Sequence, residues 1–178
     1  DGPPCLIALG ATLVLREGKT HRALPLEDFF IAYGKQDRRP GEFVEAIHLP
    51  KPQTGWSFRA YKISKRFDQD ISALLGAFHV KVEHGAVVDL RIAFGGMAAI
   101  PKRALRTEAA LRGKPWSEAS VAAAIPMLAQ DYQPISDMRA SAAYRMKVAG
   151  NLLRKCYFET SETADLARVT FAGGRAHG

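Results

Sequence analysis

Hydrophobic and polar positions alternate in three runs in the middle of the chain, at 57–63, 71–82 and 86–94. A period of two is typical of β-strands, because successive side chains point to opposite faces of a sheet. The last two runs meet at a tight turn formed by Glu83, His84 and Gly85, which favours antiparallel pairing. The pattern therefore predicts a three-stranded antiparallel sheet.

The residues after this sheet change to a helical period. Helices are predicted over 101–112, from Ser117 to about 130 with a kink at Pro126, and from a cap at Ser136 and Asp137 through 158. Packed against the strands, this helical bundle gives an α+β fold.

The residues before the sheet predict a smaller unit of short elements. These are a helix at 3–10 with proline in its first turn, a hairpin of strands at 11–16 and 21–24, a helical turn at 25–30, a polar loop at 34–41 and a strand at 42–49. Pro50, Pro52 and Gly55 then mark a boundary. We expect domains at 1–52 and 53–159, followed by a flexible tail at 160–178 that is rich in small and polar residues.

One charged loop separates two of the hydrophobic runs. Between Trp56 and Leu75 the chain carries cations and carboxylates close together, at Lys62, Lys65, Arg66, Asp68 and Asp70. Such a segment is either a solvated loop or a loop held over an anionic group, and charge runs are usually exposed. The residues alone leave both interpretations open.

Composition and charge narrow the class of protein. The chain has 178 residues and a net charge of +7, but its basic residues are dispersed and predict no nucleic-acid partner. No apolar run approaches the roughly 18 residues of a membrane span. Cys5 and Cys156 stand far apart, which is typical of reduced thiols and predicts a cytoplasmic protein.

Sequence motifs for common catalytic and nucleotide sites are missing from the 178 residues. The five histidines are scattered and predict no metal site, and no G-x-G-x-x-G is present. Gly18-Lys19-Thr20 resembles the end of a phosphate-binding loop, but that loop requires glycine where this chain has Leu13. No catalytic residue is predicted, so any chemistry depends on a cofactor or on another part of the protein.

Several stretches nevertheless resemble one family of flavoproteins. PLEDFFIAYGKQDRRPGEFVEAIHLP, which contains the pattern Y-x-K-x-x-x-x-P-x-E, resembles the flavin-binding part of xanthine dehydrogenases, especially of their bacterial small subunits. AYKISKRFDQDIS, LRIAFGGMAAIPKRA and the residues from Asp137 to Arg145 resemble the C-terminal domain shared by molybdenum hydroxylase flavoproteins, including CO dehydrogenase. The resemblance covers residues 1–158.

The resemblance implies FAD as the cofactor and NAD as the electron acceptor. The family's pyrophosphate-binding loop and iron–sulphur motifs are missing, so the chain corresponds to the C-terminal part of the small subunit. Implied partners are the upstream FAD and iron–sulphur domains of the same subunit and a molybdenum-binding large subunit, in a hetero-oligomer. Hypoxanthine or xanthine would be oxidised at the molybdenum cofactor. Two alternatives remain: a carbon monoxide or aldehyde dehydrogenase relative, or a non-catalytic docking domain.

The resemblance also implies flavin-binding positions. Asp1 matches the aspartate that closes the family's Ser-Pro-x-x-Asp motif, and Val44, with Phe43 beside it, matches an apolar residue that contacts the flavin. Lys62 matches a flavin-contacting lysine. A reduced flavin develops negative charge, which a fixed lysine stabilises as a point charge.

The charged loop is implied to cover the NAD side of the flavin. Residues 63–73 match the family's loop there, and Arg66 is expected to act on the cofactor from within it. Gln69 stands where mammalian relatives carry an acidic residue. The loop is therefore expected to influence how electrons leave the flavin.

Overall fold

The computed structural model describes residues 1–161, in which a short helix and a small sheet come first. These elements are α1 (Gly2–Ala8), β1 (Thr12–Glu17), β2 (Thr20–Pro25), α2 (Leu26–Phe29), β3 (Phe30–Ala32), β4 (Lys35–Gln36) and β5 (Phe43–His48). The sheet has the order β2-β1-β5 with antiparallel pairs, so β5 returns to the free side of the predicted hairpin. The predicted helix, hairpin and helical turn are confirmed.

The loop at 34–41 contains one element that the prediction lacked. Its first residues form β4, which pairs with β3. The loop then closes on Glu42, whose carboxylate accepts hydrogen bonds from Nε and Nη2 of Arg22 at 2.7 and 2.8 Å and from the Arg39 N–H at 2.7 Å. The glutamate of the Y-x-K-x-x-x-x-P-x-E pattern therefore holds this loop against the hairpin.

The second sheet contains the three predicted strands and a short fourth one. Its order is β6 (Trp56–Ile63), β7 (Leu74–Glu83), β8 (Ala86–Gly95) and β9 (Lys102–Arg103), with all neighbours antiparallel. β9 exists because the chain reverses after Gly95 and returns beside β8. The predicted start of β7 at residue 71 is wrong, because residues 71–73 belong to the charged loop.

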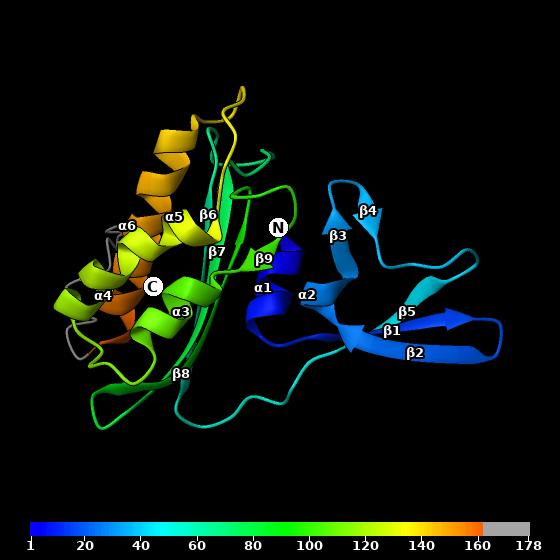
Figure 1. Ribbon diagram of the computed structural model, residues 1–178, viewed down its shortest axis with the longest axis horizontal. Coiled ribbons are helices and arrows are strands. Elements are labelled where there is room, and N and C mark those ends of the chain that lie inside the picture. Colours follow the sequence, from blue (N-terminus) through cyan, green and yellow to red (C-terminus); the bar gives the residue numbers. More distant parts are fainter. Residues whose placement is uncertain (162–178) are drawn as a thin grey trace, which may run out of the picture.

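Helices cover one face of this second sheet (Figure 1). They are α3 (Leu105–Leu111), α4 (Glu118–Ala124), α5 (Leu128–Asp131) and α6 (Ala142–Thr160), and the one-turn helix η1 (Ile125–Met127) produces the predicted break at Pro126. Leu74, Phe78, Ile92 and Phe94 from the strands pack against them. The predicted α+β fold is confirmed.

Two predicted helix starts are wrong. Lys102–Arg103 form the return strand β9 and Ala104 is the N-cap position, so α3 begins at Leu105. Ser141 caps α6 by accepting from the Tyr144 N–H, five residues after the predicted cap. Asp137 accepts from the backbone N–H groups of Arg139 and Ala140 in a local turn, and no helix follows it until Ala142.

The opposite face of the second sheet is covered by α1 (Figure 1). Ile7 and Ala8 of α1 share a core with Leu75, Ala77 and Ala93 of β7 and β8. The helix at the start of the chain therefore packs on a sheet formed many residues later. The predicted boundary between 1–52 and 53–159 remains a prediction.

Within residues 1–161 no helix is long and apolar enough to cross a membrane, and no cluster of three or more metal-ligating side chains occurs. The predicted tail lies outside the described residues from position 162 onward.

Candidate functional site

The face under α1 is too long for that helix to cover. Seven helical residues span about 10 Å, whereas the ten residues of β7 span about 33 Å. Both ends of the sheet face therefore remain open, and a cavity lies at each of them. The cavity at the N-terminal end of α1 is lined by Asp1, one of the residues predicted to bind the cofactor.

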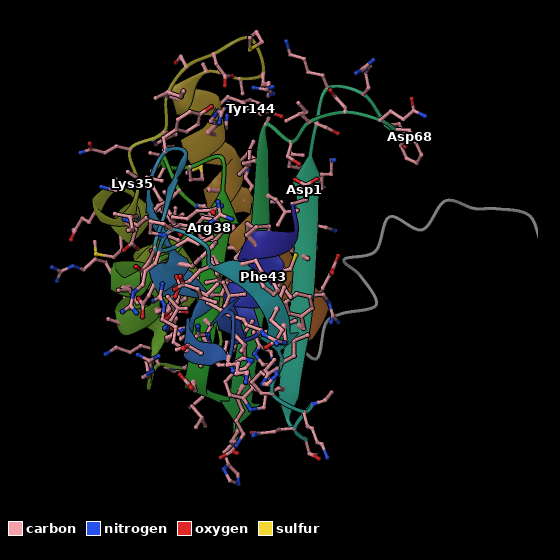
Figure 2. All side chains as sticks on the ribbon, turned by 90° about the vertical axis from the view of Figure 1, so that its right-hand side faces the viewer. Asp1, Lys35, Arg38, Phe43, Asp68 and Tyr144 are labelled. Atoms are coloured by element: carbon pink, nitrogen blue, oxygen red, sulfur yellow. The ribbon has the colours of Figure 1, made fainter. Side chains whose placement is uncertain are left out.

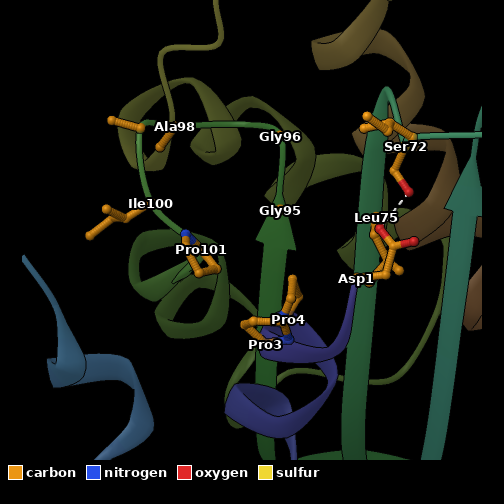
Figure 3. A pocket seen from close by; sticks show the side chains of 12 residues that line it. Asp1, Pro3, Pro4, Ser72, Leu75, Gly95, Gly96, Ala98, Ile100 and Pro101 are labelled. Carbon is orange, nitrogen blue, oxygen red and sulfur yellow. Dashed lines mark hydrogen bonds between the residues drawn. The ribbon is translucent and has the colours of Figure 1, made fainter. Parts of the chain in front are cut away.

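This first cavity has a volume of about 270 Å³ and is lined mainly by small side chains and backbone. Figure 3 shows Pro3 and Pro4 of α1 on one side and the segment from Gly95 to Pro101 on another. The remaining lining residues are Asp1, Ile71, Ser72 and Leu75. Its walls are therefore largely apolar, with polar atoms at one edge.

Glycines make this wall possible. Gly96 has φ +78°, and a Cβ there would lie 2.5 Å from the carbonyl oxygen of Ala73. A Cβ on Gly95 would lie 3.0 Å from Pro4. Only glycine lets the turn after β8 approach both α1 and the start of β7 this closely.

The polar edge joins two residues predicted to bind the cofactor. Lys62 Nζ donates to Asp1 Oδ2 at 2.8 Å and to the carbonyl oxygen of Asp70 at 2.7 Å. Ser72 Oγ donates to the other carboxylate oxygen of Asp1 at 2.5 Å (Figure 3). Lys62, with 42% of its side chain exposed, does not line the cavity itself but is fixed beside it through its ion pair with Asp1.

The outer part of the charged loop points away from this edge. Figure 2 shows Asp68 at the far end of the loop from Asp1. Arg66 donates through Nη2 to the Gln69 carbonyl, and its backbone N–H donates to Asp70, which holds the pKa of that carboxyl below its ordinary value. The structure therefore places Arg66 and Gln69 in the same loop as the site but outside the cavity lining.

Phe43 and Val44 lie on β5, in the other sheet, and neither lines the first cavity. The two residues are 50% and 41% exposed, so apolar surface stays open on β5, where Figure 2 shows Phe43. A role for these two residues in cofactor contact remains a prediction.

The wall from Gly95 to Pro101 was not among the predicted site residues. The paired glycines at the end of β8 were the available signal, since such a pair indicates positive φ or close approach of backbone. The small side chains that follow, Ala98 and Ala99, line the cavity but carry no chemical signature.

The donor set of this site fits a planar cofactor that acquires negative charge. Small side chains and backbone leave an apolar space of about 270 Å³, which suits part of an aromatic ring system. Lys62 supplies a cation at the edge, and the Ser72 hydroxyl holds Asp1 in place.

Comparisons with known proteins identify the family. The family described as CO dehydrogenase flavoprotein C-terminal domain matches residues 59–160, and the FAD binding domain in molybdopterin dehydrogenase matches residues 1–52. A nicotinate hydroxylase of Emericella nidulans is 34% identical over 126 residues, covering 68% of this chain and 9% of the relative. A xanthine dehydrogenase FAD-binding subunit of Escherichia coli O157:H7 is 27% identical, covering 93% of this chain and 54% of the relative.

A solved structure agrees with these matches. Carbon monoxide dehydrogenase of Hydrogenophaga pseudoflava superposes with a TM-score of 0.82 at 27% identity, covering 87% of this chain and 54% of that chain. The chain thus spans about half the length of the bacterial relatives and about a tenth of the longest ones. Residues 1–52 match the FAD binding domain in molybdopterin dehydrogenase, and the chain belongs to the CO dehydrogenase flavoprotein C-terminal domain family.

Proposed function

We propose that this chain forms one wall of the FAD site in the flavin subunit of a xanthine dehydrogenase-like molybdenum hydroxylase. In the complete enzyme, electrons from hypoxanthine or xanthine oxidation at molybdenum would pass through iron–sulphur clusters and FAD to NAD. The observation that carries the proposal is the small-residue cavity with Asp1 in its lining and the Lys62 ammonium bonded to that carboxylate. The two family matches support FAD as its occupant.

A bound flavin accepts two electrons and passes them on, and negative charge develops on its ring system as it does so. Lys62 would stabilise that charge, and the hydrogen bonds to Asp1 and to the Asp70 carbonyl hold its Nζ in place beforehand. A cation fixed before the reaction stabilises the charge without rearranging during it.

The walls of the cavity would orient the ring and exclude water. The Gly95–Gly96 turn and the two prolines of α1 bring backbone and short side chains to the cavity surface. Asp70 and Ser72, at the inner end of the charged loop, connect that loop to Asp1 and Lys62. A change in the loop would therefore reach the cofactor edge through these contacts.

Activity assays on the intact enzyme test whether it oxidises xanthine and reduces NAD. We expect xanthine-dependent reduction of NAD, which Lys62→Met slows about tenfold or more, since the ammonium is worth at least about 1.4 kcal/mol in a partly enclosed site. Reduction of an artificial electron acceptor that takes electrons before the flavin should stay near normal. Lys114→Met, an exposed lysine remote from the cavity, is the control.

The same activity assays distinguish this proposal from a second candidate function. The carbon monoxide dehydrogenase superposition and a 29% identical glyceraldehyde dehydrogenase medium chain of Sulfolobus acidocaldarius favour a subunit that serves another substrate. Turnover with carbon monoxide or an aldehyde, and none with xanthine, would assign the enzyme to that branch. Equal loss of dye and NAD activities in Lys62→Met would contradict the cofactor-edge role.

A further inference from the structure

A second and larger cavity lies at the other end of the sheet face under α1. It has a volume of about 660 Å³ and is separated from the first cavity by the helix itself. Its lining comes from the end of α1, the linker after β5, and strands β6, β7 and β8: Leu9, Gly10, Leu49, Pro50, Lys51, Pro52, Gln53, Trp56, Phe58, His79, Asp89 and Arg91. This space has no part in the proposed flavin site.

Aromatic rings form one wall of the second cavity. Trp56 stacks on His79 with ring centroids 4.2 Å apart and an angle of 29° between the planes. Phe58 meets the edge of the same histidine at 6.2 Å, because antiparallel pairing sets Phe58 opposite His79. Burial lowers the pKa of His79, so its ring is neutral at pH 7 and the wall is uncharged.

The ionic groups of the second cavity are paired except for one cation. Arg91 is held by the Ile7 carbonyl and by Glu27, and Asp89 pairs with Arg112 at 2.8 Å. Lys51 is exposed and forms no ion pair with any residue in the range 1–161. The cavity therefore presents one uncompensated positive charge beside its apolar walls.

We propose that this second cavity binds an aromatic carboxylate of one or two rings. Its volume lies within the range of small-molecule sites, about 300–1,000 Å³. The indole and phenyl surfaces of Trp56 and Phe58 suit a flat aromatic ring, and Lys51 suits a single carboxylate. Proline residues 50 and 52 stiffen the linker that closes this side, so the site is largely formed before the ligand arrives.

Titration calorimetry on the intact protein that contains this chain tests the proposal with 2-naphthoate as the probe. We expect saturable binding of one molecule per chain. The neutral isostere 2-naphthamide should bind about three- to fivefold more weakly, as for loss of one exposed ion pair. Cyclohexanecarboxylate, which keeps the charge but lacks the aromatic ring, should also bind more weakly than 2-naphthoate.

Substitutions test whether the probes bind in the second cavity. Lys51→Gln should weaken 2-naphthoate by the same three- to fivefold and leave 2-naphthamide unchanged, because the amide never used the charge. Trp56→Phe should weaken both probes, whereas Lys19→Gln, an exposed lysine in the β1–β2 turn, should affect neither. If Trp56→Phe fails to fold, the effects of Lys51→Gln and Lys19→Gln on 2-naphthoate binding test the proposal without it. Absence of saturable binding to the intact protein, or equal effects of Lys51→Gln and Lys19→Gln, would overturn the proposal.

Discussion

Two glycines with the same backbone conformation differ in what surrounds them. Gly96 and Gly113 have φ of +78° and +75°, but only Gly96 has backbone atoms where a Cβ would go. Replacing Gly113 by alanine should cost about 1 kcal/mol through backbone strain. Gly96→Ala should cost about 1 to 3 kcal/mol more, because the methyl group meets the Ala73 carbonyl.

Urea unfolding of the two alanine variants separates strain from steric conflict. The shared positive φ makes Gly113→Ala the matched control. Equal losses in the free energy of unfolding would show that the turn after β8 relaxes freely, and the tight cavity wall inferred here would be wrong.

Glu42 makes the stability of the first sheet depend on pH. Hydrogen bonds from Arg22 lower the pKa of Glu42 from 4.5 to about 2. The stabilisation is therefore present above pH 4.5 and is lost as the pH falls toward 2, since the unfolded chain takes up the proton first. Without this carboxylate, the free energy of unfolding should depend less on pH between pH 4.5 and about 2.

The measurement is the urea midpoint between pH 2.5 and 7 for the unaltered chain and for Glu42→Gln. The difference between the two should shrink as the pH is lowered. Glu118→Gln, at an exposed position of α4, provides the control. A difference that stays constant with pH would contradict the role assigned to the Arg22 hydrogen bonds.

At the scale of elements, one carboxylate joins the first helices to the second sheet. Glu27 of α2 accepts from Arg91 of β8 and, at 3.1 Å, from Arg103 of β9. Arg103 in turn pairs with buried Glu108, and Arg91 also holds the Ile7 carbonyl of α1. These contacts position α1 between the two cavities.

Glu27→Gln should lower the free energy of unfolding by about 2 kcal/mol, because it leaves two partly buried guanidinium groups under-paired. Hydrogen exchange should accelerate more in α1 than in α6. Glu83→Gln removes a surface ion pair with Lys81 and should change little. Unaltered exchange in α1 would show that apolar packing alone fixes the helix.

The sequence predicted elements well where periodicity was strong and poorly where side chains competed with the backbone. Strands β6 and β8 and the hairpin followed from alternation and turn residues. The start of α6 did not, because Asp137 uses its carboxylate in a local turn and against Arg145. β9, two residues long, carries no pattern of its own and depends on pairing with β8.

At the scale of the whole molecule, the site depends on contacts between distant segments. Asp1 and Lys62 were predicted from family resemblance, and the fold brings them to 2.8 Å. The cavity itself could not be predicted from alternation, because it results from the difference in length between α1 and the sheet it covers. Gly95 and Gly96 signalled a close approach, but only the fold shows that α1 is the partner of Gly95 and the start of β7 the partner of Gly96.

The central claim is that the Asp1–Lys62 edge borders a bound flavin, and the flavin midpoint potential of the intact protein tests it most directly. The charges of Lys62 and Asp1 should shift the flavin midpoint potential in opposite directions. Lys62→Met should lower the potential by about 30 mV, and Asp1→Asn should raise it, because one removes a cation and the other a carboxylate from the same edge. Unchanged potentials in both variants, or shifts of the same sign, would contradict the account.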